Sequence, residues 1–410
     1  MIVNKNVLYI SYDGMTDPLG QSQVIPYLVA LSEKGFAFTI LSFEKKERYA
    51  QRKDQIKAIL DAAGIRWEPL TYTKSPPVLS TLYDYSRMKR KASRLHESMN
   101  YSLVHCRSYI PALAGLVLKR KYKLPFIFDM RGFWADERVD GKLWDLRNPL
   151  FKTIYQFFKM KEIAFINQSA AIISLTKAAK DEILKWKNLQ IEPDKITVIP
   201  CCVNTELFDP DKITTDQLQS MRQKLNLNTE NFVLGYLGSI GTWYMLDDML
   251  KFFKSLKKEI EGAKFLFITE DDPESITEKS RQFGINIEDI IITKAERKEV
   301  PLMISLFNYG LFFIKPAYSK IASSPTKQGE IMAMGVPAIC NVGVGDSDHI
   351  VKTYNSGFVV PVNNYDNVIK KISTTVFDKQ QIRKGAIDYF SLDKGATEYF
   401  NVYNSVLNAG

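Results

Sequence analysis

The sequence predicts an α/β fold of two doubly wound domains, each with a parallel sheet covered by helices on both faces. Three observations carry this prediction. The chain has 410 residues, which is too long for one ordinary core at about 150 residues per domain. Short apolar runs of strand length alternate along it with amphipathic stretches of helical spacing. Such alternation of strand and helix is typical of parallel sheets.

Six strands are predicted in the first half, each bounded by polar or turn residues. They are Val7–Ile10, Phe38–Phe43, Leu103–His105, Phe126–Asp129, Ala171–Leu175 and Ile196–Ile199. A helix is expected after the first strand, because Val24, Leu28 and Leu31 fall on one helical face and Gly35 supplies a stop.

The second half repeats this layout without a detectable sequence repeat. Its predicted strands are Phe232–Leu237, Lys264–Ile268, Ile290–Thr293, Tyr309–Ile314, Ala338–Asn341 and Gly357–Val360. The segment 200–210 is interpreted as a linker, so domains are expected at residues 1–200 and 201–388, followed by a terminal segment 389–410. Tandem domains of this type place a cleft between the carboxyl edges of two sheets, where ligands bind.

Composition narrows the class of protein. Hydrophobic residues at 45% and charged residues at 25% exclude a disordered or fibrous chain. A net charge of +9 favours anionic partners, but no nucleic-acid-binding pattern occurs, so no nucleic acid is expected. Four cysteines without a C-x-x-C pair, and no long apolar stretch of the signal-peptide or membrane-spanning type, predict a cytoplasmic protein.

Two glycine-containing loops follow predicted strands. Gly20 and Gln21 lie in the first loop, which lacks the G-x-G-x-x-G fingerprint of dinucleotide binding. The second loop contains Gly238, Ser239, Gly241 and Thr242 and is not a Walker loop. Each is either a phosphate-cradling turn or an ordinary turn before a helix.

The segment 323–337 predicts a short helix. Ser324 is expected to cap it with Pro325 in first position, while Gly335 and Pro337 end it. Lys327 and Glu330 share one face, either as a solvated ion pair or as binding residues. In the second interpretation, Lys327 neutralises a diphosphate and Glu330 accepts hydrogen bonds from ribose hydroxyls.

Neither a metal nor a cofactor is expected. The three histidines, His96, His105 and His349, have no cysteine or carboxylate at ligand spacing. The run Asp346-Ser347-Asp348 matches D-x-D, but it follows two glycines in a second-half loop and not the nucleotide strand of metal-dependent transferases.

Several of these segments, in order along the chain, resemble retaining glycosyltransferase family 4. Gly20-Gln21 resembles the family's glycine loop, residues 196–204 its "IPNGVD" segment, Gly238–Gly241 its diphosphate loop, and residues 325–337 its "SPTK..E.MA.G.P" variant. The resemblance implies the GT-B fold, in which two Rossmann-like domains face a central cleft and a terminal helix, here residues 390–403, crosses back to the first domain. The implied donor-binding residues are Gly20, Gln21, Gly238, Ser239, Gly241, Thr242, Ser324, Pro325, Thr326, Lys327 and Glu330.

The resemblance also implies a reaction. A sugar moves with retention from a nucleotide-diphosphate-sugar donor to a glycan or lipid-linked acceptor, without a metal. Helix N-termini at Gly20 and Gly241, together with Lys327, are expected to stabilise the leaving diphosphate. Two alternatives stay open: a nucleotide-sugar epimerase of the same fold, and a non-catalytic protein that binds sugar nucleotides or polysaccharide.

Departures from the family pattern bear on those alternatives. Ala322 stands where the motif E-x₇-E has its first glutamate. The diphosphate loop of the family usually has an arginine and a lysine, whereas this chain has Ser239 and Tyr244-Met245 nearby. Arg107 falls on the place of a histidine near the reacting sugar, while His105 is either buried on its strand or in the cleft. Arg107, Arg131 and Lys327 are the candidate catalytic residues.

The segment 128–137 resembles the "RD.WPE" stretch of polysaccharide-building members of the family. It contributes Asp129, Asp136 and Glu137, which with His105 are candidates for the acceptor side of the cleft. The alternative is a structural cluster of ion pairs.

A membrane surface is a further expected partner. Residues 87–124 carry ten lysines and arginines against Glu97 alone, and Phe151, Ile154, Tyr155 and Phe158 fall at helical spacing. A basic face with aromatic residues predicts peripheral contact with anionic lipid at the inner face of the membrane. The alternative is that these aromatic residues belong to the core.

Overall fold

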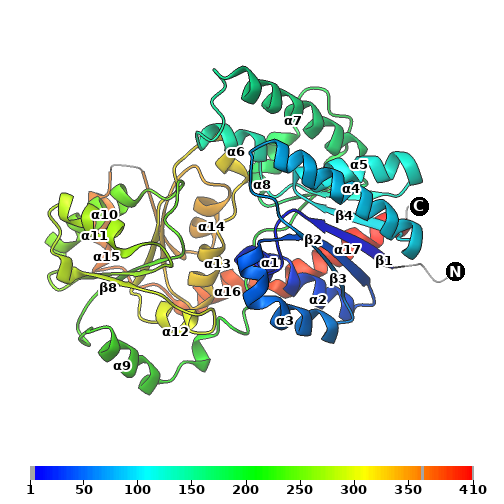
Figure 1. Ribbon diagram of the computed structural model, residues 1–410. Coiled ribbons are helices and arrows are strands. Elements are labelled where there is room, and N and C mark those ends of the chain that lie inside the picture. The colour runs from blue at the N-terminus through cyan, green and yellow to red at the C-terminus, as the bar shows by residue number, and fades with distance from the viewer. Residues whose placement is uncertain (1–4, 362–363, 409–410) are drawn as a thin grey trace. The chain divides into compact units, whose positions relative to one another are not determined.

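The computed structural model describes residues 5–361 and 364–408. The chain separates into two compact units, residues 1–200 with 392–410 and residues 201–391 (Figure 1). Each unit contains one parallel sheet with helices around it, so the predicted fold class is confirmed.

The first unit has a seven-stranded parallel sheet in the order β3-β2-β1-β4-β5-β6-β7. Its strands are β1 (Asn6–Ser11), β2 (Ala37–Glu44), β3 (Arg66–Thr71), β4 (Leu103–Arg107), β5 (Phe126–Asp129), β6 (Ala171–Ser174) and β7 (Ile196–Val198). Chain order reverses between the neighbours β1 and β4, where Ser11 pairs with Arg107. In such sheets this reversal is the point at which ligands bind.

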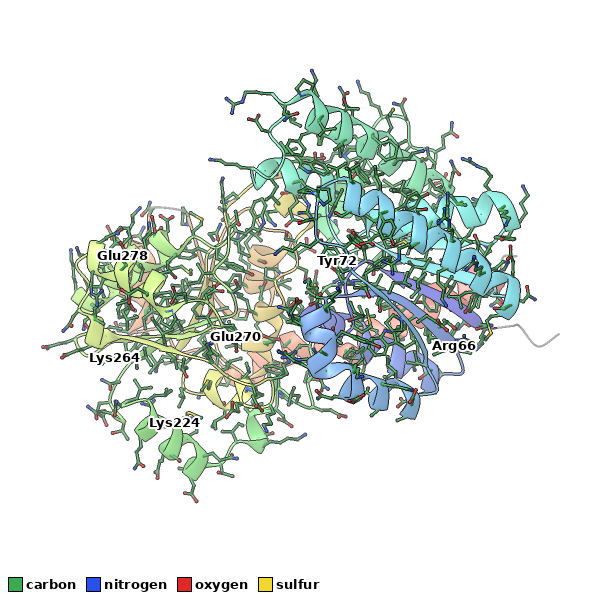
Figure 2. All side chains as sticks on the ribbon, in the orientation of Figure 1. Arg66, Tyr72, Lys224, Lys264, Glu270 and Glu278 are labelled. Carbon is green, nitrogen blue, oxygen red and sulfur yellow. The ribbon has the colours of Figure 1, made fainter. Side chains whose placement is uncertain are left out.

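Strand β3 is absent from the sequence prediction. Its residues are half-buried or exposed, and Pro69 interrupts the apolar pattern. A strand at the edge of a sheet tolerates proline and needs no continuous apolar run, so its sequence carries a weak signal. Arg66, at its start, donates to Glu68 at 2.7 Å and is labelled in Figure 2.

Helices cover both faces of the first sheet. They are α1 (Pro18–Gln23), α2 (Ile25–Glu33), α3 (Lys46–Ala62), α4 (Leu79–Met99), α5 (Tyr109–Tyr122), α6 (Trp134–Asp140), α7 (Pro149–Gln168), α8 (Lys177–Ile183) and α17 (Leu392–Asn408), with a 3₁₀ turn η1 (Pro193–Lys195). Helix α17, red in Figure 1, packs against α2 although it comes last in the chain. The ring of its Tyr403 lies edge-on to Phe36, with centroids 5.2 Å apart.

The second unit has a six-stranded parallel sheet in the order β10-β9-β8-β11-β12-β13. Its strands are β8 (Val233–Leu237), β9 (Lys264–Ile268), β10 (Ile290–Thr293), β11 (Tyr309–Phe312), β12 (Ala338–Asn341) and β13 (Gly357–Val360). Its helices are α9 (Thr215–Lys224), α10 (Leu246–Glu259), α11 (Pro273–Gln282), α12 (Val300–Ile304), α13 (Thr326–Ala333), α14 (Ser347–Thr353), α15 (Asp366–Ile372) and α16 (Lys379–Phe390), with 3₁₀ turns η2 (Pro210–Lys212), η3 (Ile287–Asp289) and η4 (Tyr318–Ala322).

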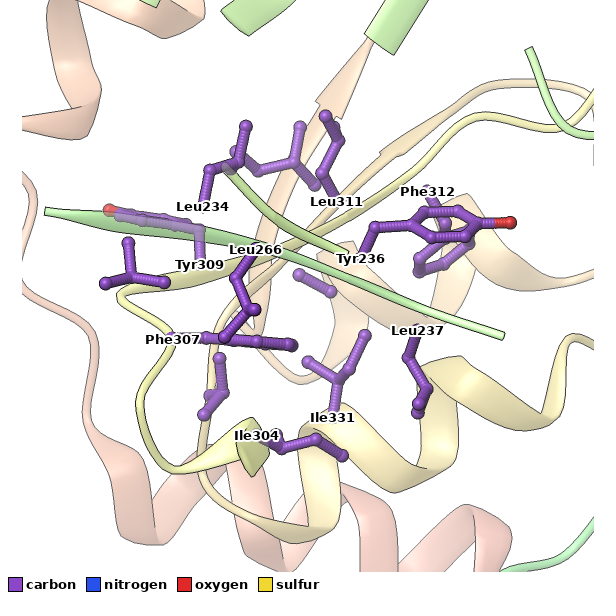
Figure 3. Close-up of a cluster of buried hydrophobic side chains, with 14 of the residues drawn as sticks. Leu234, Tyr236, Leu237, Leu266, Ile304, Phe307, Tyr309, Leu311, Phe312 and Ile331 are labelled. Atoms are coloured by element: carbon purple, nitrogen blue, oxygen red, sulfur yellow. The ribbon is translucent and has the colours of Figure 1, made fainter. Parts of the chain in front are cut away.

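Packing in the core of this unit fixes the position of β8. Leu234, Tyr236 and Leu237 are buried among side chains of β9, β11 and α13 (Figure 3). A Cβ at Gly235 would come 2.2 Å from the Phe307 ring, so only glycine lets that ring lie directly on the strand. This close packing sets the position of the loop that follows β8.

Two further findings concern the cysteines and the hydropathy of the helices. Cys106, Cys201, Cys202 and Cys340 are all buried and form no disulfide. Among the described helices, none combines the length and apolar character needed to cross a bilayer.

Candidate functional site

In the second unit the chain reverses between β8 and β11, and the residues beyond these two strands are candidates for a ligand site. Lys327 of α13 reaches this edge. Its Nζ lies 3.6 Å from the centroid of the Tyr244 ring and 4.0 Å from that of Tyr236. A Cβ at position 238 would lie 3.6 Å from the same nitrogen, so a side chain there would cover the ammonium, and glycine leaves this side of it less covered.

The ammonium of Lys327 is an unsatisfied group. The residue is 6% exposed, and Nζ has no hydrogen-bond partner among residues 5–361 and 364–408. Burial lowers the pKa of Lys327 well below the ordinary lysine value, while the charges of Glu330 and Asp271 oppose this shift. A buried donor without a partner is costly, and the presence of one here favours a ligand.

Glu330 lies one turn further along α13 and is 4% exposed. Its Oε1 accepts a hydrogen bond from Nη1 of Arg297 at 2.5 Å, and that guanidinium lies 4.6 Å above the Phe208 ring. The solvated Lys327–Glu330 pair is therefore not observed. Sequence reasoning missed Arg297, because it stands in the polar segment 294–299, which has no distinguishing pattern.

The loop after β8 is built differently from the expectation. Asp271 accepts hydrogen bonds from Ser239 Oγ at 3.0 Å and from the backbone N–H of Ile240 at 2.5 Å, so a carboxylate of the protein occupies these donors. Gly238 and Gly241 have φ of +96° and +44°, as sharp turns require. Helix α10 begins only at Leu246, so the prediction of a helix N-terminus at Gly241 is wrong, and Thr242 is exposed.

The start of α13 also differs. Ser324 does not cap the helix, because its Oγ accepts a hydrogen bond from the backbone N–H of Cys201 at 3.1 Å. Pro325 occupies the capping position and Thr326 the first helical position. Ala322 is buried in η4, two residues after Lys320, whose ammonium lies 3.7 Å above the Trp243 ring.

The two acidic residues of the D-x-D run have protein partners. Asp346 accepts a hydrogen bond from Tyr389 at 2.8 Å, and Asp348 pairs with Lys352 at 3.3 Å. Within the described part of the chain, no three histidine, cysteine or acidic side chains are grouped so that they could hold a metal ion.

In the first unit, Gly20 lies inside α1 and not before it, which corrects the expected helix N-terminus there. A Cβ at this position would come 2.2 Å from the Gly14 carbonyl, so close packing within the loop requires glycine. Gln21 donates to the Thr16 carbonyl at 3.0 Å. The loop is held by the buried carboxylate of Glu44, which accepts from the N–H of Met15 at 2.7 Å and which sequence reasoning missed.

His105 is a buried core histidine, 1% exposed on β4. Its Nδ1 lies 2.7 Å from the Tyr403 hydroxyl and its Nε2 lies 3.3 Å from Asp129 Oδ2. Burial lowers the pKa of His105, against the opposing effect of Asp129. Asp129, wholly buried at the end of β5, also accepts from Tyr399 at 3.3 Å.

Two arginines approach the same carboxylate. Arg107 Nη1 is 3.8 Å from Asp129 Oδ2 and Arg131 Nη1 is 3.9 Å from Asp129 Oδ1. Burial alone would raise the pKa of Asp129, but Arg131, His105 and Arg107 outweigh it and lower that pKa. Four predicted site residues thus meet at one edge of the first sheet.

Asp136 belongs to a separate cluster on α6 and α7. It accepts hydrogen bonds from Tyr155 at 2.8 Å and Lys159 at 2.9 Å. Lys159 also pairs with the buried Glu162, which accepts from Tyr109. The structure thus favours the alternative of a structural ion-pair cluster for Asp136; Glu137, beside it in the first turn of α6, is half-buried.

Of the stripe predicted for lipid contact, only Phe158 is buried, whereas Phe151, Ile154 and Tyr155 are half-buried. Phe158 is 7% exposed and packs against the rings of Trp134 and Trp144. The apolar side chains that α7 exposes are instead Leu150, Phe157 and Met160. The core alternative therefore holds for Phe158.

Two family models match the chain, one after the other. The model described as Glycosyltransferase Family 4 matches residues 23–207, and that described as Glycosyl transferases group 1 matches residues 218–388. The chain belongs to the family 4 glycosyltransferases. The arginine cluster lies within the first matched segment, and Lys327 with Glu330 lies within the second.

Individual members of this family are distant. The capsular polysaccharide biosynthesis glycosyltransferase CapM of Staphylococcus aureus is 24% identical over 245 residues, which span 58% of this chain and 61% of CapM. The UDP-Gal:α-D-GlcNAc-diphosphoundecaprenol α-1,3-galactosyltransferase of Escherichia coli is 21% identical over 291 residues, 70% of this chain and 69% of that one. The structure of Anabaena HepE in complex with UDP and glucose has a TM-score of 0.71 at 12% identity, covering 98% of this chain and 100% of HepE, and thus shares the fold.

Proposed function

We propose that this chain transfers a sugar from a nucleotide-diphosphate-sugar donor to a glycan or lipid-linked acceptor, with retention and without a metal. The observation that carries the proposal is the buried ammonium of Lys327, which has no hydrogen-bond partner among the described residues. A diphosphate supplies both the negative charge and the acceptor oxygens that this group lacks. The E. coli relative is named for a UDP-galactose donor, and a second HepE structure is a complex with UDP-glucose; both donors are of this class and support the proposal.

In the proposed reaction, the bond between the anomeric carbon and the diphosphate oxygen breaks while the acceptor oxygen bonds to that carbon from the same face. The acceptor hydroxyl gives its proton to the departing phosphate. Lys327 offsets the charge that develops on the leaving group, and Glu330, held by Arg297, accepts from the ribose hydroxyls. Arg107 and Arg131 supply positive charge on the acceptor side.

The donor site is tested by calorimetric titration with UDP, GDP and ADP and their sugars. Glu330→Ala is expected to weaken nucleotide binding by about 1–3 kcal/mol. Lys327→Ala is expected to weaken binding of the diphosphate but not of the bare nucleoside. Lys294→Ala is the matched control, because that lysine is 63% exposed and pairs loosely with Glu270. If both site variants bind like the unmodified chain, the assigned donor site is wrong.

Product analysis separates the alternatives. Sugar transfer requires an acceptor, whereas an epimerase interconverts epimers or releases free sugar without one. Nucleotide binding without turnover over a broad panel of acceptors would instead support a non-catalytic binding protein.

A second part of the proposal places the acceptor at the cytoplasmic face of a membrane. Helices α4, α5 and α7 pack side by side, and α7 exposes Leu150, Phe157 and Met160 on one face. Lys161 lies over the Phe157 ring at 5.5 Å, so this face combines positive charge with apolar side chains. Each lysine or arginine near an anionic surface contributes about 1 kcal/mol.

Vesicle sedimentation tests this placement. Binding is expected to anionic vesicles, to fade with added salt, and to weaken when Phe157 and Met160, or Lys89, Arg90 and Lys91, are changed to glutamate. Leu184→Glu, at an exposed leucine that follows α8, is the control. Equal binding to neutral and anionic vesicles, or none at low salt, would favour an acceptor that is not held at a membrane.

A further inference from the structure

Arg107 is a second buried cation, and its surroundings satisfy it only in part, through a side-chain interaction with Tyr9. The residue is 3% exposed, and its Nε and Nη1 have no hydrogen-bond partner in the described part of the chain. The nearest carboxylate oxygens are 3.6 Å from Nε, on Asp13, and 3.8 Å from Nη1, on Asp129. Both separations exceed hydrogen-bond length, so the guanidinium is near negative charge without being bonded to it.

Asp129 is a fixed part of the buried core and is 0% exposed. Its Oδ2 contacts His105 Nε2 and the Tyr399 hydroxyl, each at 3.3 Å, whereas its Oδ1 has no hydrogen-bond partner among the described residues and lies 3.9 Å from Arg131 Nη1. Asp13 is different, because its side chain is 48% exposed and stands on the loop after β1. Of the two carboxylates, Asp13 is therefore the one that an incoming ligand can replace.

The position of Arg107 suits an anion for two further reasons. It ends β4, beside β1, where chain order in the sheet reverses and ligands bind. Helix α5, 14 residues long, begins two residues later at Tyr109, and no side chain caps its first turn. The positive end of the helix dipole therefore adds to the charge of the guanidinium.

We propose that Arg107 is the centre of an anion subsite of the first unit. The carboxylate of Asp13 occupies this subsite until a phosphate or carboxylate oxygen of the acceptor displaces it. The shared chemistry is a planar fork of N–H donors directed at an oxyanion. The acceptor class is thus a saccharide with an acidic group, either a phosphate link or a uronic acid. Naming the ligand as acceptor rests on the proposed function, whereas the subsite itself does not.

The test measures anion binding without nucleotide, in a Lys327→Ala background that removes the diphosphate-binding lysine of the second unit. The probes are inorganic phosphate and glucuronate, followed by NMR titration or calorimetry. Arg107→Gln is expected to weaken the preferred probe about tenfold or more. Asp13→Asn is expected to tighten it severalfold, because the competing carboxylate has lost its charge.

Controls keep the outcome interpretable. Arg52→Gln removes an exposed arginine of the same unit and is expected to change nothing. Asp13 is half exposed, so Asp13→Asn reports on the subsite even if Arg107→Gln does not fold. Unchanged or weaker binding in Asp13→Asn, or no binding of either probe to the parent, overturns the subsite. Failure of donor binding in the calorimetric screen would overturn the proposed function and leave this result standing.

Discussion

The two sheets each place a buried cation where chain order reverses, but they surround it differently. Lys327 lies between the rings of Tyr236 and Tyr244, with no carboxylate of the described residues within 4.0 Å of its nitrogen. Arg107 lies within 4.0 Å of two carboxylates, Asp13 and Asp129. Because aromatic rings surround Lys327, the charge of this lysine stays available to a ligand. The charge of Arg107, by contrast, is attracted to two carboxylates until a ligand replaces one of them.

This contrast means that the loss of a buried charge is expected to act differently in the two units. In the first unit, removal of the shared carboxylate of Asp129 is expected to damage the fold. In the second unit, removal of the Lys327 charge is expected to stabilise the fold and weaken ligand binding.

Asp129→Ala is expected to lower the free energy of unfolding by about 3–5 kcal/mol, because it leaves buried cationic groups without their shared carboxylate. Urea unfolding measures the loss. Asp145→Ala, which removes an exposed carboxylate paired with Arg147, is expected to change it by less than about 0.5 kcal/mol. Similar values for the two variants would show that the network does not hold the first unit together.

Lys327→Met is expected to act in opposite directions on stability and binding. The free energy of unfolding rises by about 1 kcal/mol, because an unsatisfied buried cation is replaced by an apolar chain of similar length. Affinity for a nucleoside diphosphate falls about 10- to 100-fold. Denaturation and calorimetry on the same sample measure both, and a variant that loses stability would contradict the aromatic enclosure described here.

The pH dependence of stability sharpens this prediction. The folded-state pKa of Lys327 lies below its unfolded value of about 10.4, so between the two only the unfolded chain holds the proton. Stability of the unmodified chain therefore rises with pH across that window, by at most about 1.4 kcal/mol per pH unit. The stability advantage of Lys327→Met is expected to shrink as pH rises, and other titrating groups cancel in the difference. A constant difference would mean that Lys327 keeps its ordinary pKa.

Tyr403→Phe gives the smallest effect. It removes the hydroxyl 2.7 Å from His105 Nδ1 and is expected to cost about 1 kcal/mol, with no change in nucleotide binding. Tyr83→Phe, at a tyrosine that is 58% exposed, is the control. Thermal unfolding measured with and without nucleotide separates a role of Tyr403 in stability from a role in nucleotide binding.

The fold follows largely from the sequence, since twelve of the thirteen described parallel strands appear as short apolar runs. The edge strand β3 does not, because its residues are half-buried and it contains Pro69. The site was predicted less completely. Lys327 and Glu330 stand out locally, but Tyr236, Tyr244 and Arg297 join them from distant segments that no periodicity connects.

Local rules also failed where a distant partner competed. Ser324 has the residue type and position of a helix cap, yet it bonds to the backbone of Cys201, 123 residues earlier. Gly20 looks like a ligand-contacting glycine, yet the Gly14 carbonyl fills the space above it. Both outcomes depend on tertiary packing, which overrides the local preference.

The place of α17 has a consequence for synthesis of the chain. Tyr399 and Tyr403 complete the hydrogen bonds of Asp129 and His105 in the first unit, although nearly two hundred residues of the second unit are made before them. During translation, the unit that emerges first from the ribosome is therefore finished last. Helix α2 and His105 of this unit therefore stay uncovered until α17, which follows the second unit in the chain, has left the exit tunnel.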